Sequence, residues 1–183
     1  ALSEAIRLDA RHAHAWLNLG VVTSEMGDRV GVEEALPVAA RLLPHNAEVW
    51  AEMATFYETT NRLEEMRNAV ERGLAIAPQN PRVIFEAARL ERRENAPDAA
   101  LRTLGMLIPS QLPPRQQRGY WYEMGRNLDR VERHHDAWNA YAEANRLARG
   151  EMQRQLAGAQ PLAAMLDALA VQPPLQVFDE VAD

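Results

Sequence analysis

The sequence has no cysteine and no lysine, and these absences exclude several kinds of site. Without cysteine the chain has no disulfide, no thiolate metal ligand and no thiol nucleophile. All 20 basic residues are arginines, and 26 acidic residues outnumber them, so the formal net charge is −6. A nucleic-acid-binding surface is normally basic. We therefore predict no nucleic-acid partner.

Long apolar runs and catalytic motifs are also missing. No stretch approaches the roughly 18 apolar residues of a transmembrane helix, and no secretory signal is visible. We therefore predict a cytoplasmic location without membrane contact. The sequence has no glycine-rich phosphate loop and no nucleophile elbow. His134 and His135 are adjacent, so on a helix their rings point about 100° apart and do not share a metal easily. We predict no catalytic residues, no cofactor and no metal site.

What the chain does contain is a repeat of 34 residues. Trp16 and Trp50 are separated by this distance, and each is followed by small and apolar residues in the same order. Ile84 takes the tryptophan's place in a third copy, and Trp121 takes it in a fourth that begins three residues late. A fixed period of this length indicates one supersecondary unit copied along the chain.

Each copy contains two apolar runs of helical period, about 13 residues long and separated by a turn. With the tryptophan counted as position 4, position 8 is always small, which lets two helices approach closely. We therefore predict an all-α fold in which helix pairs stack as a solenoid. The small residues at position 8 are Gly20, Ala54, Ala88 and Gly125.

This pattern resembles the tetratricopeptide repeat, whose signature begins W-x2-L-G-x2-Y. The resemblance covers about residues 13–150 and is weakest at position 11, where only Tyr57 carries the aromatic residue. It implies a right-handed superhelix of antiparallel helix pairs. The predicted repeats span 13–46, 47–80, 81–114 and 118–150.

The two ends depart from the period. Residues 1–10 fit the second helix of an incomplete preceding repeat, which predicts further sequence upstream. Residues 151–183 form a predicted helical cap and tail, because an apolar stripe over 161–170 can cover the last repeat. The Gln-Pro-Pro sequence at 172–174 marks a break, and residues 175–178 are compatible with the first strand of a following domain.

The resemblance also implies a concave groove lined by the first helix of each repeat. Phe85 and Tyr122 share position 5 of neighbouring repeats, and Arg89 and Arg126 share position 9. Aromatic residues and arginine are enriched at binding hot spots, and arginine holds carboxylates in two-point contacts. We therefore predict a peptide or protein partner with apolar and acidic residues. The predicted groove residues are Arg82, Phe85, Glu86, Arg89, Arg93, Tyr122, Glu123, Arg126 and Arg130.

A simpler interpretation of the same residues is structural. Glu86–Arg89 and Glu123–Arg126 have the i,i+3 spacing of ion pairs on a solvated helix face, worth about 0.2–0.5 kcal/mol each. One known groove chemistry of the family is excluded. The carboxylate clamp needs lysine and asparagine where this chain has Leu17, Val21 and Glu52.

Three functions are compatible with these observations. The first is a non-catalytic module that binds a peptide segment in its concave groove. The second follows from a resemblance of the repeat layout to the N-terminal part of bacterial sulfotransferases, which implies a repeat arm whose activity lies outside this chain. The third is an oligomerisation spacer that associates with itself.

Overall fold

The computed structural model describes the backbone of residues 2–170, with most side chains as far as residue 157. The predicted break at 172–174 and the possible strand at 175–178 lie outside this part. The described chain is helical and has no strand, which confirms the all-α prediction. Its elements are α1 (Leu2–Leu8), α2 (Ala13–Met26), α3 (Arg29–Leu42), α4 (Ala47–Thr59), α5 (Leu63–Ile76), α6 (Pro81–Arg93), α7 (Pro97–Leu104), the 3₁₀ turn η1 (Pro109–Gln111), α8 (Pro114–Arg130) and α9 (His134–Ala170).

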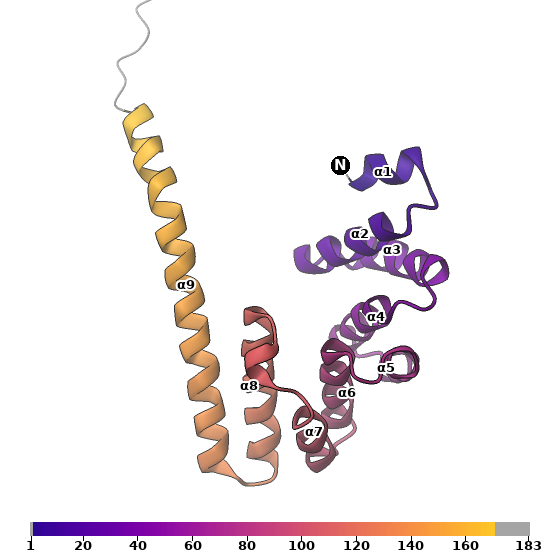
Figure 1. Ribbon diagram of the computed structural model, residues 1–183, viewed down its shortest axis with the longest axis vertical. Coiled ribbons are helices and arrows are strands. Elements are labelled where there is room, and N and C mark those ends of the chain that lie inside the picture. The colour runs from indigo at the N-terminus through magenta and orange to yellow at the C-terminus, as the bar shows by residue number, and fades with distance from the viewer. Residues whose placement is uncertain (1, 171–183) are drawn as a thin grey trace, which may run out of the picture.

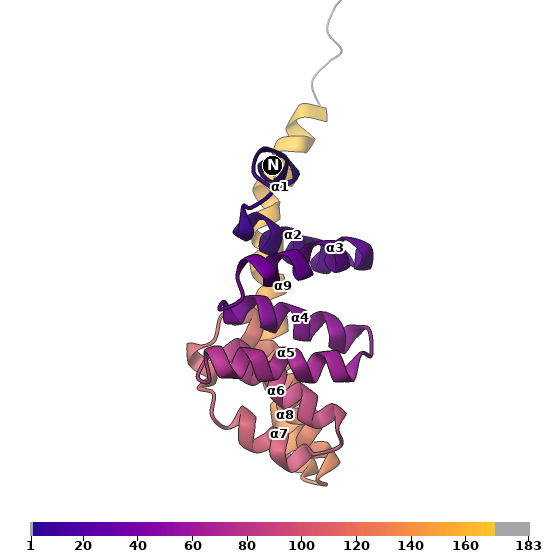
Figure 2. The same cartoon turned by 90° about the vertical axis from the view of Figure 1, so that its right-hand side faces the viewer.

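The helices stack as antiparallel pairs. Helices α2 and α3, α4 and α5, α6 and α7, and α8 and α9 pack against each other, and each pair contacts the next. Figure 2 shows the pairs from α1 to α7 piled along one direction. In Figure 1 the described chain forms a U, with α9 in one arm and the first helices in the other. This arrangement is the predicted solenoid.

Two tryptophans of the register, Trp16 and Trp50, make the same contact in successive pairs. Trp50 is buried, and its indole N–H donates to the Pro44 carbonyl at 3.0 Å. The indole of Trp16 makes the equivalent bond to the Ala10 carbonyl, also at 3.0 Å. Each tryptophan therefore joins its helix to the preceding connection. The repeat in sequence is thus a repeat of contacts.

The turns between paired helices share one backbone conformation. Position 15 has a positive φ in all four copies: 74° at Gly27, 60° at Asn61, 61° at Asn95 and 60° at Glu132. Glycine adopts this left-handed region freely and asparagine tolerates it, whereas other residues are strained there. Glutamate at 132 therefore occupies a position that the other copies give to better suited residues.

Small residues at position 8 allow the close approach of paired helices, as predicted. Ala54 and Ala88 are completely buried. A Cβ atom added to Gly125 would lie 2.7 Å from Cε1 of Tyr141, closer than real Cβ contacts. The second helix therefore packs directly on the backbone of the first.

Two features differ from the regular pattern. Helix α7 has 8 residues, whereas α3 and α5 have 14 each, because the chain turns at Gly105 and continues through η1. Helix α9 has 37 residues, and the helix predicted over 161–170 is its last part rather than a separate element. Strong helix formers dominate residues 151–170, so the helix continues without a stop. In consequence α9 extends beyond α8 (Figure 1).

Trp138 lies on an exposed face of α9. Its side chain is 73% exposed. Ala137, Ala140 and Ala144 of α9 are buried instead. At about 100° per residue, Trp138 then points away from that buried face.

Candidate functional site

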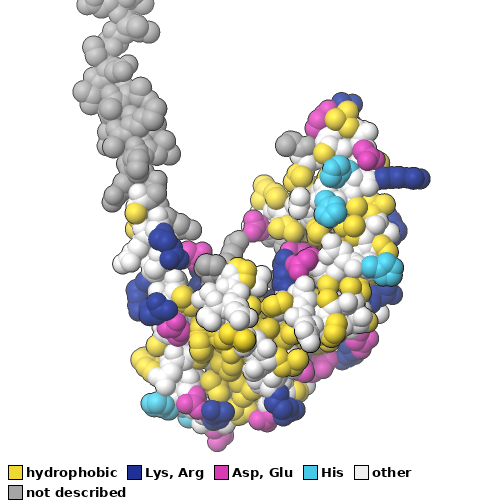
Figure 3. Space-filling view, in the orientation of Figure 1, with side chains coloured by type: hydrophobic (Ala, Val, Ile, Leu, Met, Phe, Trp, Pro, Cys, Tyr) yellow, Lys and Arg dark blue, Asp and Glu magenta, His cyan; other side chains and the backbone are white. Residues whose placement is uncertain are grey.

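The inner side of the U contains a hollow between α6, α8 and α9, with a volume of about 480 Å³. In Figure 3 apolar side chains gather at the bottom of the U, between its two arms. We call this the α6–α8 hollow. Its lining residues are Phe85, Arg89, Arg118, Gly119, Tyr122, Glu123, Arg126 and Ala148.

Two aromatic rings give the hollow its apolar part. Phe85 and Tyr122 are both half-buried. The Phe85 ring approaches the backbone of α8 at Gly119, where an added Cβ would lie 3.4 Å from its Cζ. The Tyr122 hydroxyl donates to Oδ1 of Asn145 at 2.7 Å, which fixes the ring against α9. The rings of neighbouring repeats therefore border one hollow, as their shared position predicts.

Three arginines give the hollow a cationic character. Arg89 lies over the Phe85 ring, with its Cζ 5.8 Å from the ring centroid. Arg118 pairs with Glu151 at 2.6 Å, and Arg126 pairs with Glu123 at 3.2 Å. Glu123 is the single acidic side chain among the described lining residues. Although the chain as a whole is acidic, this hollow carries more positive than negative side chains.

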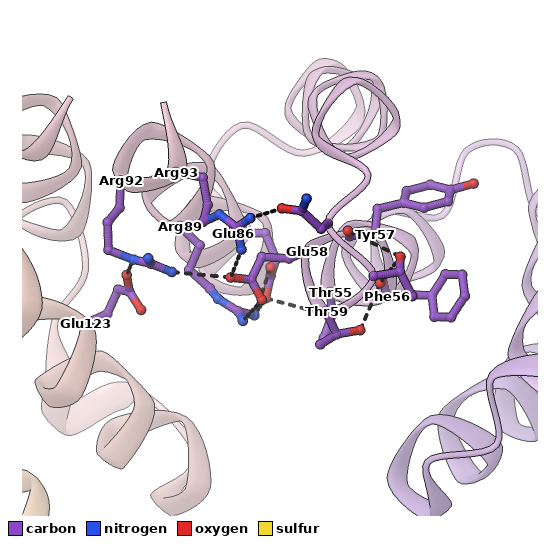
Figure 4. A network of polar contacts seen from close by, with 12 residues as sticks. Thr55, Phe56, Tyr57, Glu58, Thr59, Glu86, Arg89, Arg92, Arg93 and Glu123 are labelled. Atoms are coloured by element: carbon purple, nitrogen blue, oxygen red, sulfur yellow. Dashed lines mark hydrogen bonds and ion pairs between the residues drawn. The ribbon is translucent and has the colours of Figure 1, made fainter. Parts of the chain in front are cut away.

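A partly buried network of ion pairs, shown in Figure 4, adjoins the hollow. Glu58 of α4 is at its centre, paired with Arg89 at 2.6 Å and with Arg92 and Arg93 at 3.3 Å each. Arg92 also pairs with Glu123, so the network links α4, α6 and α8. We call it the Glu58 network.

Glu86 is the most secluded carboxylate on the α6 side of this network. It is 4% exposed, accepts a hydrogen bond from the Thr55 hydroxyl at 3.0 Å and pairs with Arg89 at 3.1 Å. Burial raises the pKa of Glu86, and the opposing effects of Arg89 and Thr55 do not cancel it. Burial alone would lower the pKa of Arg89, but Glu86 and Glu58 outweigh it and the pKa is raised. Arg89 therefore keeps its charge inside the protein.

The structure divides the predicted groove residues into two groups. Phe85, Arg89, Tyr122, Glu123 and Arg126 line the hollow together. The remaining four lie elsewhere, and the next paragraph gives their contacts. Arg118 and Ala148 line the hollow as well but were missed, because the family's groove positions include neither of them.

The four other predicted residues are engaged in contacts between helices. Arg82 pairs with Glu48 at 3.3 Å and with the buried Glu52. Glu86 is enclosed as described. Arg93 contacts Glu58 and Asn61 near the turn, and Arg130 donates to the Arg92 carbonyl at 2.8 Å. These side chains join successive repeats and do not line the hollow.

The structural interpretation of the ion pairs is therefore wrong in one respect. Glu86–Arg89 and Glu123–Arg126 do form, but their carboxylates are only 4% and 2% exposed. The sequence pattern shows only that the two residues of each pair are three positions apart on the same helix. Contacts from α4 and from neighbouring turns bury these groups, and such contacts depend on how the repeats stack.

A second hollow lies outside the first, between α7, α8 and α9, with a volume of about 530 Å³. We call it the outer groove. Its floor is apolar, with Leu101, Trp121, Met124 and Leu128. It is bordered by Arg133, whose charge Asp136 balances at 2.6 Å. The outer groove offers apolar contact without an excess of cationic groups.

Paired helices stacked around a concave hollow define the class of protein as an α-solenoid. Residues 47–90 match the family model of the tetratricopeptide repeat. This part of the chain therefore carries the repeat that the signature residues indicated. Among the described residues, no helix combines the length and apolarity needed to cross a membrane.

Solved structures agree with the fold. The chain is similar to a structure of MamA, with 14% identity, a TM-score of 0.60, and coverage of 84% of this chain and 88% of that one. The chain is also similar to a structure of the Cut9–Hcn1 complex, with 13% identity, a TM-score of 0.75, and coverage of 81% of this chain and 29% of that one. A third similar structure is YrrB, described as "a TPR protein with an unusual peptide-binding site". Its identity is 16% and its TM-score is 0.56, and the match covers 86% of this chain and 79% of that one. These identities show the fold alone. No curated protein matches the chain, and the sulfotransferase resemblance stays a prediction.

Proposed function

We propose that the chain is a non-catalytic protein-interaction module that binds a peptide segment in the α6–α8 hollow. The observation that carries this proposal is the meeting of two aromatic rings and three arginines on one concave surface. An apolar side chain of the partner would lie against Phe85 and Tyr122. An acidic side chain would pair with Arg126.

Arg126 is suited to this task because its guanidinium is accessible. Its side chain is 55% exposed, and among the described residues it pairs with Glu123 through one nitrogen. A guanidinium has five N–H donors, so most of them stay available for a two-point contact with a carboxylate. Arg89 is different, because Glu58 and Glu86 already occupy it.

The proposal is tested by fluorescence anisotropy with two labelled peptides. One has a central phenylalanine flanked by glutamates, and the other has lysines in place of the glutamates. We expect the acidic peptide to bind and the basic one not to bind. Tyr122→Ala and Arg126→Ala should each weaken binding about tenfold or more, the scale of an interface hot spot.

Asn139→Ala is the matched control, because Asn139 is an exposed residue bordering the outer groove. It should leave the affinity for the acidic peptide unchanged. Equal binding of the two peptides, or a loss of affinity in Asn139→Ala but not in Tyr122→Ala, would contradict the proposed site.

A further inference from the structure

A row of exposed side chains runs along α9 beside the face that packs on α8. The face of α9 that packs on α8 carries the buried residues Ala137, Ala140 and Ala144. A neighbouring face includes Trp138, Met152 and Leu156, which are 73%, 62% and 60% exposed. The row consists of Trp138, Ala142, Asn145, Arg149, Met152 and Leu156, all of them exposed.

The spacing of this row is that of a helix-pairing seam. Successive members are separated by four and three residues in alternation, the a and d positions of a heptad repeat. Large apolar residues so exposed on one helix face usually mark an interaction surface. In the described part of the chain α9 lies beside α8 only, and its second half extends past it (Figure 1).

We propose that a second copy of this chain covers the row, through antiparallel pairing of α9 with the same helix of the partner. A two-fold axis near residue 147 places Trp138 opposite the partner's Leu156 and Ala142 opposite the partner's Met152. It also places Asn145 opposite the partner's Arg149. Every contact then occurs twice, as an isologous dimer requires.

The chemistry of the row favours this antiparallel arrangement. Small Ala142 faces large Met152 of the partner subunit, and the amide of Asn145 faces a guanidinium that can donate to it. Parallel pairing would instead set Arg149 against the partner's Arg149, and like charges facing each other destabilise a seam. Arg146, beside the axis, is neutralised by Glu143 at 2.5 Å. The two copies therefore meet without repulsion.

The proposed seam meets the proposed peptide site at one residue. Asn145 of the row accepts a hydrogen bond from the Tyr122 hydroxyl, and Tyr122 lines the α6–α8 hollow. Trp138, Met152 and Leu156 of the row are not among the lining residues, so substitutions there test the dimer separately from peptide binding. The dimer can fail while peptide binding holds, and the reverse is equally possible.

The first test is sedimentation velocity of the full chain across a wide range of concentration. We expect a reversible dimer. Trp138→Glu should raise its dissociation constant about 30-fold or more, as loss of an aromatic hot spot does. Val30→Glu is the matched control, since Val30 is 67% exposed on α3 and should have no effect. Helicity measured by circular dichroism confirms that both variants fold.

The second test uses the absence of cysteine in this sequence. Ala142→Cys and Met152→Cys chains are prepared separately, then mixed and oxidised. Antiparallel pairing predicts a disulfide between the two different chains and little within either preparation alone. A monomer at every concentration would overturn the proposal, as would a dimer in which Ala142→Cys links only to itself.

Discussion

At the scale of single residues, the buried carboxylates decide how the repeats hold together. Glu52, Glu86 and Glu123 share one register position and are 5%, 4% and 2% exposed. Each is paired with an arginine. Arg82 pairs with Glu52 and Arg92 pairs with Glu123, in both cases from a neighbouring repeat. A buried charge that loses its partner is costly, whereas an exposed pair contributes little. These glutamates therefore serve cohesion between repeats rather than ligand contact.

The raised pKa of Glu86 predicts a specific pH dependence. The folded protein holds a proton on Glu86 at a higher pH than the unfolded chain does. The contribution of this group to the free energy of unfolding therefore falls as pH rises from the ordinary carboxyl pKa to the raised one. The stability of wild type relative to Glu86→Gln should fall with pH across this range, as measured by chemical denaturation.

Glu143 provides a control of opposite sign. Its hydrogen bond to Arg146 lowers the pKa of Glu143. Its stabilising contribution is therefore present above the ordinary carboxyl pKa and is lost as pH falls. Relative to Glu143→Gln, wild type should gain stability as pH rises. If both comparisons change in the same direction, the burial argument for Glu86 is wrong.

At the scale of the helix pair, the close contact depends on residues without a bulky side chain. Gly125 of α8 faces the Tyr141 ring of α9, which leaves no room for a methyl group. Gly150 of α9 has no neighbouring atom within 4 Å of an added Cβ. The two glycines lie in helices but differ in surroundings. Substitutions at these two positions therefore distinguish the effect of packing on stability from the effect of helix propensity.

Substitution of each glycine by alanine measures this difference. Gly150→Ala should raise the free energy of unfolding by about 0.5–1 kcal/mol, because alanine is the better helix former. Gly125→Ala has the same gain but forces Tyr141 to move, so it should be less stable than Gly150→Ala by about 1–3 kcal/mol. Urea denaturation of the two variants gives the comparison. Equal stabilities would show that the α8–α9 contact relaxes without cost.

The pair of α6 and α7 differs from the other pairs because its second helix is short. The short α7 ends at Leu104, and the chain then passes through η1 to α8. A helix as long as α3 would continue for nearly two more turns. Its absence coincides with the outer groove, whose floor includes Trp121 and Met124. A local stop in one helix thus exposes the apolar surface of the next pair.

At the scale of the whole molecule, stability and proposed binding depend on different arginines. Arg89 is 17% exposed and lies within the Glu58 network, whereas Arg126 is 55% exposed at the hollow. Arg89→Ala leaves Glu86 without its guanidinium partner and should lower the free energy of unfolding by about 3 kcal/mol. Arg126→Ala should lower it by about 0–1 kcal/mol, because Arg92 still pairs with Glu123.

Thermal melting combined with the acidic-peptide assay checks this separation. Arg126→Ala should melt close to wild type while losing affinity for the peptide. Arg89→Ala should melt lower. If Arg126→Ala destabilised the protein as much as Arg89→Ala, the guanidinium at 126 would be part of the cohesive network instead of the binding surface.

The sequence by itself determined the helical solenoid and the repeat within it. Tryptophans 34 residues apart, small residues at position 8 and turn residues at position 15 are local signals, and each specifies a contact or a backbone angle within one repeat. They also predicted that Phe85 and Tyr122 share one surface. The continuous α9 and the exposed Trp138 were not predicted, because helix propensity carries no information about which face a neighbour covers.

Only the tertiary structure decided which charges are buried and which are accessible. Glu58 meets arginines more than 30 residues away, and Arg118 joins the hollow from outside the family's groove positions. Such contacts depend on the angle and offset at which one repeat stacks on the next. The three-residue delay before α8 and the short α7 change that offset. Counting positions along the sequence does not give the distance between side chains of different repeats. That distance decides which side chains are buried.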